Sequence, residues 1–578
     1  MADFELAEKR YQRWMQSACV DAESKAYLNG IANDKDTVAL RFGSELSFGT
    51  AGLRGEIAPG TNAINVYTIG QATQGLANYI LAQGKDAAKR GVAIAYDCRT
   101  NSKELADRSA AVLTAAGIPV YLFDALRPTP LLSFTLLHLG CIAGINITAS
   151  HNPKQYNGYK VYWEDGAQIS GDIAKAISAQ IAKTDIFDDV KSMTAEEATS
   201  AGLLTVIGKE LDEAYYEQVT RQMINPDAIE KAADALHIVY TPLYGTGAKP
   251  VPEVLRRIGI KHLCCVDEQM VPDGTFPSVP FPNPEYPEAF TMGIELAEKV
   301  GSDLIVATDP DADRVGVMAR GTDGKFATIT GNQMGCLLLD YIITALRDKG
   351  LLGKDAYTVK SLVSTAMADK IAKENGVRMF NVYTGFKYIG SVVASEEAKS
   401  CYDFLLGFEE SYGYLRGSYA KDKDAVVAAM LICEMAAYYH LKGLTLLGAL
   451  DALYEKYGYY RDGVDNIYME GLDGPERMQK LMTSLRENPP TEIGGKQIAS
   501  LHDYKNGVIH DYAHGRDVPV EEEPANMLRF ETVEGDAIIV RPSGTEPKIK
   551  FYYLCGGATM AEAKEKSAAF ADTMKSLA

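Results

Sequence analysis

A serine stands in a polar loop that directly follows an apolar, strand-like run. The β-branched residues from Ile142 to Ile147 predict a buried strand, and the sequence from Thr148 to Pro153 predicts the turn that ends it. Open α/β sheets bind their ligands at the carboxyl ends of the strands. Ser150 is therefore placed to accept and return a chemical group, and His151 or Lys160 is available to handle its proton.

The spacing around this serine is not that of a hydrolase. The G-x-S-x-G motif would need glycine at the positions of Thr148 and Asn152. The loop is cationic as well as polar, because Lys154 and Lys160 follow it closely. These charges favour a phosphorylated Ser150 over an acyl-enzyme.

Three aspartates alternate just after another predicted strand. The strand covers residues 303–308, and Asp309, Asp311 and Asp313 follow it. Three carboxylates this close repel one another, so a bound cation is the natural reason to hold them in one folded loop. The alternative is a solvated acidic turn.

The spacing of these acids excludes one common calcium site. With Asp309 as the first position of an EF-hand, Arg314 stands where glycine is required and Arg320 where a bidentate glutamate is required. Mg²⁺ with few protein ligands and a phosphate oxygen in its shell fits better. A rival interpretation is the nucleophile motif of haloacid-dehalogenase-type phosphatases, in which Asp309 attacks phosphate. Those enzymes have Thr or Val at the position of Asp313.

Three further loops carry polar groups after predicted strands. The loop from Arg541 to Lys548 offers a guanidinium, hydroxyls, a glycine backbone and an ammonium, which together can surround a phosphate. Glu409 and Ser411 suit sugar hydroxyls. The glycine-rich loop from Phe48 to Gly55 allows close approach of an anion, with Arg54 as its charged partner. A sugar phosphate in a cleft would use all of these loops.

Length and composition limit the fold and the class of partner. A chain of 578 residues exceeds one core and indicates roughly three to five domains. The formal charge of −19 argues against nucleic acid and anionic membranes as partners. Nine cysteines without C-x-x-C spacing indicate free thiols in a reducing compartment. The sequence shows no apolar core of a signal peptide and no membrane span, so we expect a cytoplasmic protein.

Strands alternate with helices in three successive passes, which predicts three α/β domains with mostly parallel sheets covered on both faces. A smaller domain of strands and one helix follows. Residues 1 to about 45 are predicted to form helices over the first domain. The predicted strands cover residues 92–96, 119–123, 141–147, 238–240, 262–266, 303–308, 357–363, 377–383, 403–406, 527–532, 537–540 and 549–554. The predicted helices cover residues 103–116, 130–139, 287–299, 366–374 and 560–577, with others starting at Pro250 and after Asp424.

These motifs, in this order, resemble the α-D-phosphohexomutase family. The resemblance spans nearly the whole chain and is closest to the longer branch of bacterial α-phosphoglucomutases and animal phosphopentomutases. It implies four domains in a heart-shaped molecule: three related α/β domains with mixed sheets and a smaller α+β C-terminal domain. We expect these domains at residues 1–208, 209–323, 324–465 and 466–578, carrying the serine, metal, sugar and phosphate loops respectively.

The resemblance also implies roles for individual residues. Ser150 would carry a phosphoryl group and, with Asp309, Asp311 and Asp313, would ligate Mg²⁺. Catalysis would involve Ser150, Lys160 as acid/base, Arg54 and His151. Sugar and phosphate contacts would come from Arg314, Thr384, Gly385, Lys387, Glu409, Ser411, Arg541, Ser543, Gly544 and Thr545.

The implied reaction converts glucose 1-phosphate and glucose 6-phosphate into one another through a phosphoserine enzyme and bound glucose 1,6-bisphosphate. Ribose phosphates and mannose phosphates remain alternative substrates, and a sugar phosphatase is a further alternative. Members that use both glucose and mannose carry a histidine after the sugar-loop serine, where this chain has Tyr412-Gly413-Tyr414. A sugar-phosphate sensor or scaffold would be expected to lack Ser150 or an aspartate. We expect a monomer or a weak homodimer that takes small sugar phosphates.

Overall fold

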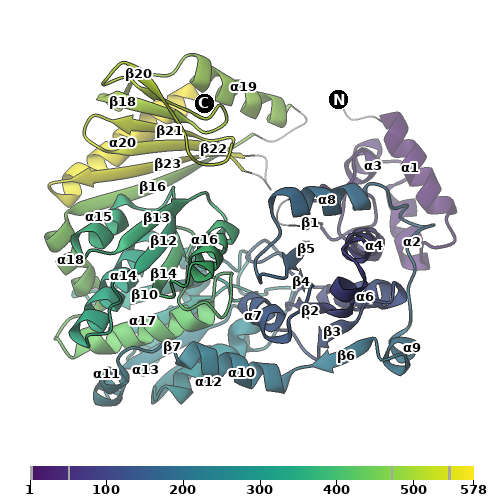
Figure 1. The fold of residues 1–578 in the computed structure, drawn as a ribbon, viewed down its shortest axis with the longest axis horizontal. Coiled ribbons are helices and arrows are strands. Elements are labelled where there is room, and N and C mark those ends of the chain that lie inside the picture. Colours follow the sequence, from purple (N-terminus) through teal and green to yellow (C-terminus); the bar gives the residue numbers. More distant parts are fainter. Residues whose placement is uncertain (1–3, 50–51, 470–472, 544–547) are drawn as a thin grey trace. The chain divides into compact units, whose positions relative to one another are not determined.

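The computed structural model describes residues 4–49, 52–469, 473–543 and 548–578, and Figure 1 shows their helices and strands. These residues fall into two units. The larger unit comprises the chain up to residue 360 together with residues 380–447. The smaller unit comprises residues 361–379 and 448–578.

Three helices open the larger unit and bury their own aromatic core. Trp14 packs edge-on against Phe42, Tyr67 and Phe187, so these helices are fixed to the α/β domain that follows. The prediction of N-terminal helices is confirmed. The helices are α1 (Phe4–Gln16), α2 (Ala22–Ile31) and α3 (Lys35–Phe42).

The first sheet has six strands in the order β1-β5-β4-β2-β3-β6. Strands β2, β3, β4 and β6 pair in parallel, whereas β5 and β1 add antiparallel. The strands are β1 (Leu53–Glu56), β2 (Val92–Tyr96), β3 (Val120–Phe123), β4 (Ala143–Ile147), β5 (Tyr156–Trp163) and β6 (Leu204–Ile207). The helices are α4 (Val66–Ala82), α5 (Lys85–Lys89), α6 (Ser102–Ala115), α7 (Thr129–Leu139), α8 (Gly171–Ile181) and α9 (Ala195–Ser200).

Side-chain alternation along β2 divides this domain into two packed faces. Val92, Ile94 and Tyr96 join the core formed with α4, α6 and α8. Helix α7 contacts β2 and β4 but contributes nothing to that core, so it packs on the opposite face, where Ala93 and Ala95 leave room. The N-terminus of α7 is thereby held at the carboxyl ends of the strands.

The second sheet has the order β11-β10-β9-β7-β8, with β8, β7 and β9 parallel and β10 and β11 antiparallel. Its strands are β7 (His237–Thr241), β8 (His262–Cys265), β9 (Leu304–Thr308), β10 (Val315–Arg320) and β11 (Phe326–Ile329). Its helices are α10 (Lys209–Thr220), α11 (Pro226–Ala232), α12 (Pro250–Arg257) and α13 (Thr291–Val300), with 3-10 turns η1 (Thr246–Ala248), η2 (Asp267–Met270) and η3 (Pro287–Phe290).

The third sheet has the order β13-β12-β14-β15, with β12 and β14 parallel and β15 antiparallel to β14. Its strands are β12 (Tyr357–Ser361), β13 (Arg378–Val382), β14 (Phe404–Glu409) and β15 (Gly413–Leu415). The helices of this region in the larger unit are α14 (Gly331–Asp348), α16 (Phe386–Ala398) and α17 (Ala425–His440). Nearly every residue of α17 is buried, which confirms that its apolar residues form core.

The smaller unit centres on an antiparallel sheet in the order β16-β23-β22-β21-β18-β19-β20, with β17 paired to β18. Its strands are β16 (Tyr459–Tyr468), β17 (Glu492–Ile493), β18 (Lys496–Asp503), β19 (Val508–Asp511), β20 (Arg516–Pro519), β21 (Leu528–Thr532), β22 (Ala537–Pro542) and β23 (Lys548–Gly557). Its helices are α15 (Ala366–Glu374), most of α18 (Leu446–Tyr457), α19 (Gly474–Glu487) and α20 (Met560–Leu577).

The predicted class of fold is confirmed: three α/β domains with mixed sheets and a β-rich C-terminal domain. The predicted strands and helices of the α/β passes lie within a few residues of the observed ones. The domain boundaries at residues 208, 323 and 465 stay a prediction. Within the described residues, no helix is long and apolar enough to cross a membrane.

One buried carboxylate joins two helices of the larger unit. Asp424 caps α17 by accepting the N–H groups of Val426 and Val427 at 2.8 and 3.1 Å. Tyr215 of α10 donates its hydroxyl to both Asp424 oxygens at 2.9 and 2.8 Å, and Tyr419 donates at 2.6 Å. Asp424 is fully buried, so these hydrogen-bond donors are needed to offset the cost of burying its carboxyl group.

We expect Tyr215→Phe to destabilise the larger unit, because it leaves a buried carboxylate short of one donor. The cost should be about 1–3 kcal/mol, seen as a lower melting temperature in calorimetry. Tyr402→Phe is the matched control, since the Tyr402 side chain is 70% exposed. Equal melting of the two variants would contradict the role given to the Tyr215 hydroxyl.

Candidate active site

The serine loop follows β4, its residue Ser150 has a strained backbone conformation, and Arg99 holds the loop through hydrogen bonds to its backbone. Ser150 adopts a positive φ of 53° and is buried, and its N–H donates to Thr148 Oγ1 at 2.8 Å. Arg99 donates to the backbone carbonyls of Ser150, Asn152, Pro153 and Tyr156. These hydrogen bonds therefore fix the backbone of the serine loop and leave the Ser150 hydroxyl free for other contacts.

Arg99 was not recognised in the sequence. It follows β2, the strand next to β4, and its Nε lies 3.3 Å from Asp97 Oδ2. Both side chains are fully buried. The sequence does contain a signal for this role: Asp97 and Arg99 follow the carboxyl end of β2, which is at the same edge of the sheet as Ser150.

The serine hydroxyl contacts the metal loop directly. Ser150 Oγ donates to Asp309 Oδ2 at 2.8 Å, and His151 Nδ1 lies 3.1 Å from the same hydroxyl. The other oxygen of Asp309 accepts the N–H groups of Asp313 and Arg314 at 3.1 and 3.0 Å. Burial and the nearby Arg314 and Arg54 charges hold the pKa of His151 well below its usual range, so the imidazole is neutral.

The three aspartates converge as the sequence predicted. Asp309, Asp311 and Asp313 are buried, and one oxygen from each lies within 4.8 Å of the others. Lys160 Nζ lies 2.7 Å from Asp311 Oδ2 and 3.7 Å from Asp313 Oδ2. Lys423 Nζ lies 3.1 Å from Asp313 Oδ2. Two ammonium groups thus offset part of the triad's charge.

Two carboxyl groups of the triad have pKa values shifted in opposite directions. Burial and repulsion from Asp311 and Asp313 raise the pKa of Asp309 well above its ordinary value. Burial also opposes ionisation of Asp311, but the charge and hydrogen bond of Lys160 outweigh it and lower the pKa. For Lys160, burial lowers the pKa, but Asp311 and Asp313 raise it further, so the net shift is upward.

The donor set fits a hard divalent cation. Asp311 Oδ1 and Asp313 Oδ1 are buried and accept no hydrogen bond from any residue that the structure describes. Buried carboxylate oxygens without donors are costly unless a cation satisfies them. Oxygen-only ligands in small number suit Mg²⁺. Asp309, Asp311 and Asp313 are therefore the residues that can hold it, with an oxygen on Ser150 adjacent.

We expect Asp313→Asn to weaken divalent-cation binding by about 10-fold or more, because it removes one charge from the ligand set. Competition of Mg²⁺ against Mn²⁺, followed by electron paramagnetic resonance, measures this affinity. Asp323→Asn is the control, since Asp323 is an exposed turn acid in the same sheet region. Unchanged affinity in Asp313→Asn would exclude the triad as the metal site.

Arg54 reaches the serine loop from a neighbouring strand. Its Nη1 donates to Asn152 Oδ1 at 3.1 Å. The prediction that Phe48–Gly55 is all loop is wrong from Leu53 onward, because those residues form β1 against β5. Gly52 has φ +93°, and a Cβ there would meet the Tyr159 carbonyl oxygen at 1.9 Å, so only glycine fits this approach. Residues 50 and 51 of this motif lie outside the described residues.

The sugar loop lies at the carboxyl end of β14. Glu409 Oε1 accepts the N–H of Gly385 at 2.7 Å, so Gly385 and Glu409 are brought together. Burial raises the pKa of Glu409 despite the nearby Lys423 charge. Thr384 Oγ1 is buried and has no hydrogen-bond partner in the described part of the chain, which suits a polar ligand group. Ser411 lies half-buried in the turn between β14 and β15.

Two further predicted residues flank this loop. Lys387 lies in the first turn of α16, and burial lowers its pKa. Arg314 forms an ion pair with Glu285 at 2.5 Å, and its backbone bridges to Gly413. The metal loop and the β14–β15 hairpin are therefore joined through Arg314.

The predicted phosphate loop belongs to the smaller unit. Arg541 stands near the end of β22, and its buried Nε has no hydrogen-bond partner among the described residues. The N–H of Ser543 donates to the Lys548 carbonyl at 2.8 Å, which draws the two ends of the loop together. Gly544 and Thr545 lie outside the described residues.

Sequence reasoning missed three residues that contact the triad or its flanks. Thr129, at the start of α7, donates its hydroxyl to Asp311 Oδ2 at 2.8 Å. Lys423 contacts Asp313, and Glu285 pairs with Arg314. The charged run Lys421 to Asp424 before an apolar helix was the signal for Lys423, whereas Thr129 and Glu285 carried none.

Comparison with known proteins identifies the family. Models of phosphoglucomutase/phosphomannomutase alpha/beta/alpha domains I, II and III match residues 45–186, 213–322 and 330–457. The chain belongs to the phosphoglucomutase/phosphomannomutase family. The resemblance to α-D-phosphohexomutases is thus confirmed, and the protein is an isomerase that acts as an intramolecular phosphotransferase of the phosphoglucomutase type.

Individual relatives of this family agree. The phosphoglucomutase of Staphylococcus aureus (strain N315) is 37% identical over 511 residues, covering 88% of this chain and 90% of that protein. The solved phosphoglucomutase parafusin (pp63) of Paramecium, in its open form, has a TM-score of 0.67 at 19% identity, covering 92% of this chain and 94% of that one. N-acetylphosphoglucosamine mutase of Aspergillus fumigatus, solved with GlcNAc-6P and magnesium, has a TM-score of 0.50 at 13% identity, with 99% of each chain covered.

Proposed function

We propose that the protein interconverts glucose 1-phosphate and glucose 6-phosphate through phosphorylated Ser150 and bound glucose 1,6-bisphosphate. The observation that carries this proposal is the contact of Ser150 Oγ with Asp309 at 2.8 Å, inside a buried triad that Lys160 also touches. A nucleophilic hydroxyl and a metal-ligating carboxylate share one hydrogen bond. The relative from Staphylococcus aureus is named a phosphoglucomutase.

The residues of this chain divide the work of phosphoryl transfer. In the forward step the bond between phosphorus and Ser150 Oγ breaks, a bond to the sugar hydroxyl oxygen forms, and the hydroxyl proton leaves to a base. Lys160 is our candidate for the acid/base group, because its ammonium end reaches the triad and Asp311 and Asp313 raise its pKa. The ammonium gives a proton to the released Ser150 oxygen, and the amine that results takes the proton of the sugar hydroxyl. Mg²⁺, when bound by Asp309, Asp311 and Asp313, supplies neutralisation of phosphate charge. Arg99 keeps the Ser150 backbone fixed through the cycle.

Substrate contacts are assigned to the loops around this centre. We assign the sugar hydroxyls to Glu409 and Ser411, with Thr384, Gly385 and Lys387 beside them. Arg314 and Arg54 face the serine loop as cations, and His151 stays neutral beside Ser150. We assign the non-reacting phosphate to Arg541, Ser543, Gly544 and Thr545. These roles are proposals that rest on the family's motif order and on the charges described above.

The geometry favours a mutase over the phosphatase alternative. In the phosphatase interpretation Asp309 would be the nucleophile, yet both of its oxygens are engaged, one by Ser150 and the other by the N–H groups of Asp313 and Arg314. Ribose and mannose phosphates remain second-choice substrates. The absence of a histidine among Tyr412, Gly413 and Tyr414 disfavours mannose.

We further propose a cytoplasmic protein that acts as a monomer or weak homodimer. None of the nine cysteines, all of which lie within the described residues, forms a disulfide, which suits a reducing compartment. The net charge of −19 leaves small phosphorylated sugars, rather than nucleic acid, as its partners.

We expect kcat/KM to be highest for glucose 1-phosphate, by at least about 10-fold over ribose 1-phosphate and mannose 1-phosphate. The three are assayed in parallel with Mg²⁺ and a trace of the matching bisphosphate. Higher kcat/KM for ribose 1-phosphate would make the protein a phosphopentomutase with the same residues in the same roles. Phosphate release without isomer formation would instead support the phosphatase alternative.

We expect Ser150→Ala to lose mutase turnover by ~10⁴-fold or more while still binding glucose 1-phosphate, because only the nucleophile is removed. Turnover and calorimetric binding are measured on the same preparation. Ser200→Ala, at an exposed position at the end of α9, is the control. Full turnover in Ser150→Ala would rule out a phosphoserine intermediate.

A further inference from the structure

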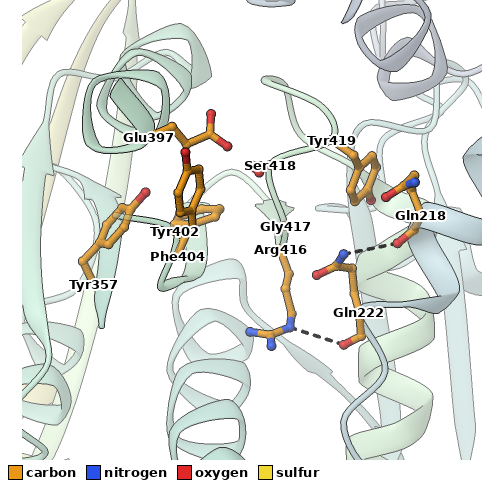
Figure 2. Close-up of a pocket in the computed structure, with 10 residues that line it drawn as sticks. All are labelled: Gln218, Gln222, Tyr357, Glu397, Tyr402, Phe404, Arg416, Gly417, Ser418 and Tyr419. Carbon is orange, nitrogen blue, oxygen red and sulfur yellow. Dashed lines mark hydrogen bonds between the residues drawn. The ribbon is translucent and has the colours of Figure 1, made fainter. Parts of the chain in front are cut away.

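A second polar cavity lies in the larger unit, away from the catalytic loops. Its volume is about 400 Å³, and the described residues that line it include no member of the triad or of the serine loop. Figure 2 shows Tyr402 and Phe404 on one side, Gln218, Gln222 and Tyr419 on the other, and Arg416 between them. The size is that of a pocket for a small metabolite.

Arg416 brings a positive charge into this cavity without a contact ion pair. Its Nε donates to the Gln222 carbonyl at 3.3 Å and its Nη1 to the Leu405 carbonyl at 2.9 Å. Within the described part of the chain, no carboxylate lies at ion-pair distance from it. The carboxylate of Glu434 is already used by the N–H groups of Ile224 and Asn225 and by a tyrosine hydroxyl.

The guanidinium is still a cation at neutral pH. Burial lowers the pKa of Arg416 to about 10, while Glu434 and Tyr341 act in the opposite direction. Arg416 is half-buried, and within the described residues its hydrogen bonds go to two backbone carbonyls. The partial loss of hydration around this cation costs free energy that a bound anion can offset. Its second terminal nitrogen, Nη2, donates to no protein acceptor among the described residues and remains available to a ligand.

The other groups around Arg416 suit a hydroxylated molecule. The amides of Gln218 and Gln222 and the hydroxyl of Ser418 can donate to and accept from hydroxyl groups. The rings of Tyr402 and Phe404 offer apolar surface for the face of a sugar. The remaining acid, Glu397, is neutralised by Lys421 at 2.8 Å. The cavity therefore combines one available cation with neutral polar groups.

We propose that this cavity is a second ligand site that binds a small hydroxylated phosphate ester, with the phosphate on Arg416 and the hydroxyl groups on Gln218, Gln222 and Ser418. The segment that follows Arg416 runs through Lys421, which donates to the Ser418 carbonyl, to Lys423 on the metal triad. A ligand here contacts the chain that carries Lys423. This site does not depend on which sugar phosphate is the substrate.

A tryptophan reporter isolates this site from the catalytic one. The chain has two tryptophans, and Trp14 and Trp163 are buried, with 1% and 8% exposure. Tyr402→Trp places a third indole at the cavity. Titration with ribose 5-phosphate is expected to give a saturable fluorescence change, whereas ribose should give none, because it lacks the phosphate. Inorganic phosphate shows whether the anion alone suffices, and a response weaker than that of the ester is expected.

Two charge variants in the reporter background should act in opposite directions. Arg416→Gln is expected to raise the Kd of ribose 5-phosphate by ~10-fold or more, since it removes a charge-assisted contact. Glu397→Gln is expected to lower the Kd, because it removes a negative charge and frees Lys421. An unchanged Kd in both variants, or an equal response to ribose, would overturn the proposal. If Arg416→Gln fails to fold, the direction of the Glu397→Gln shift still decides it.

Discussion

The mutual repulsion of three buried carboxylates is the constraint on which the catalytic region depends. Asp309, Asp311 and Asp313 lie within 4.8 Å of one another. Lys160 and Lys423 offset part of that charge from two other elements, at 2.7 and 3.1 Å. Because β5 supplies one lysine and the segment before α17 supplies the other, loops from three sheets must meet for the triad to be stable.

The rest of the larger unit serves to hold those loops. Arg99 fixes the serine loop through four backbone carbonyls, and Thr129 at the start of α7 reaches Asp311. Asp424 then anchors the segment that carries Lys423, by capping α17 and accepting the hydroxyl of Tyr215. Rigid positioning of this kind is what phosphoryl transfer needs, since most of its catalysis is alignment and charge neutralisation.

The sequence predicted the parts of the site that lie within one continuous segment. It did not predict the contacts that form between segments far apart in the chain. The loops around Ser150 and Asp309 were identifiable because strand, turn and chemistry follow one another directly. Arg99 and Lys423 carried only weak signals, a charged pair after a strand and a charged run before a helix, because their roles arise from contacts between distant segments. Antiparallel β5 was hidden by its polar positions, and β16 has no fully buried face, so its apolar signal is weak.

The most direct test of this account is the chemical identity of the phosphorylated residue. The protein is incubated with Mg²⁺ and ³²P-labelled glucose 1,6-bisphosphate, digested, and analysed by mass spectrometry before and after hydroxylamine. The account predicts label on Ser150 that resists hydroxylamine and is chased into bisphosphate by unlabelled glucose 1-phosphate. A hydroxylamine-labile acyl phosphate on Asp309, or no covalent label at all, would contradict it.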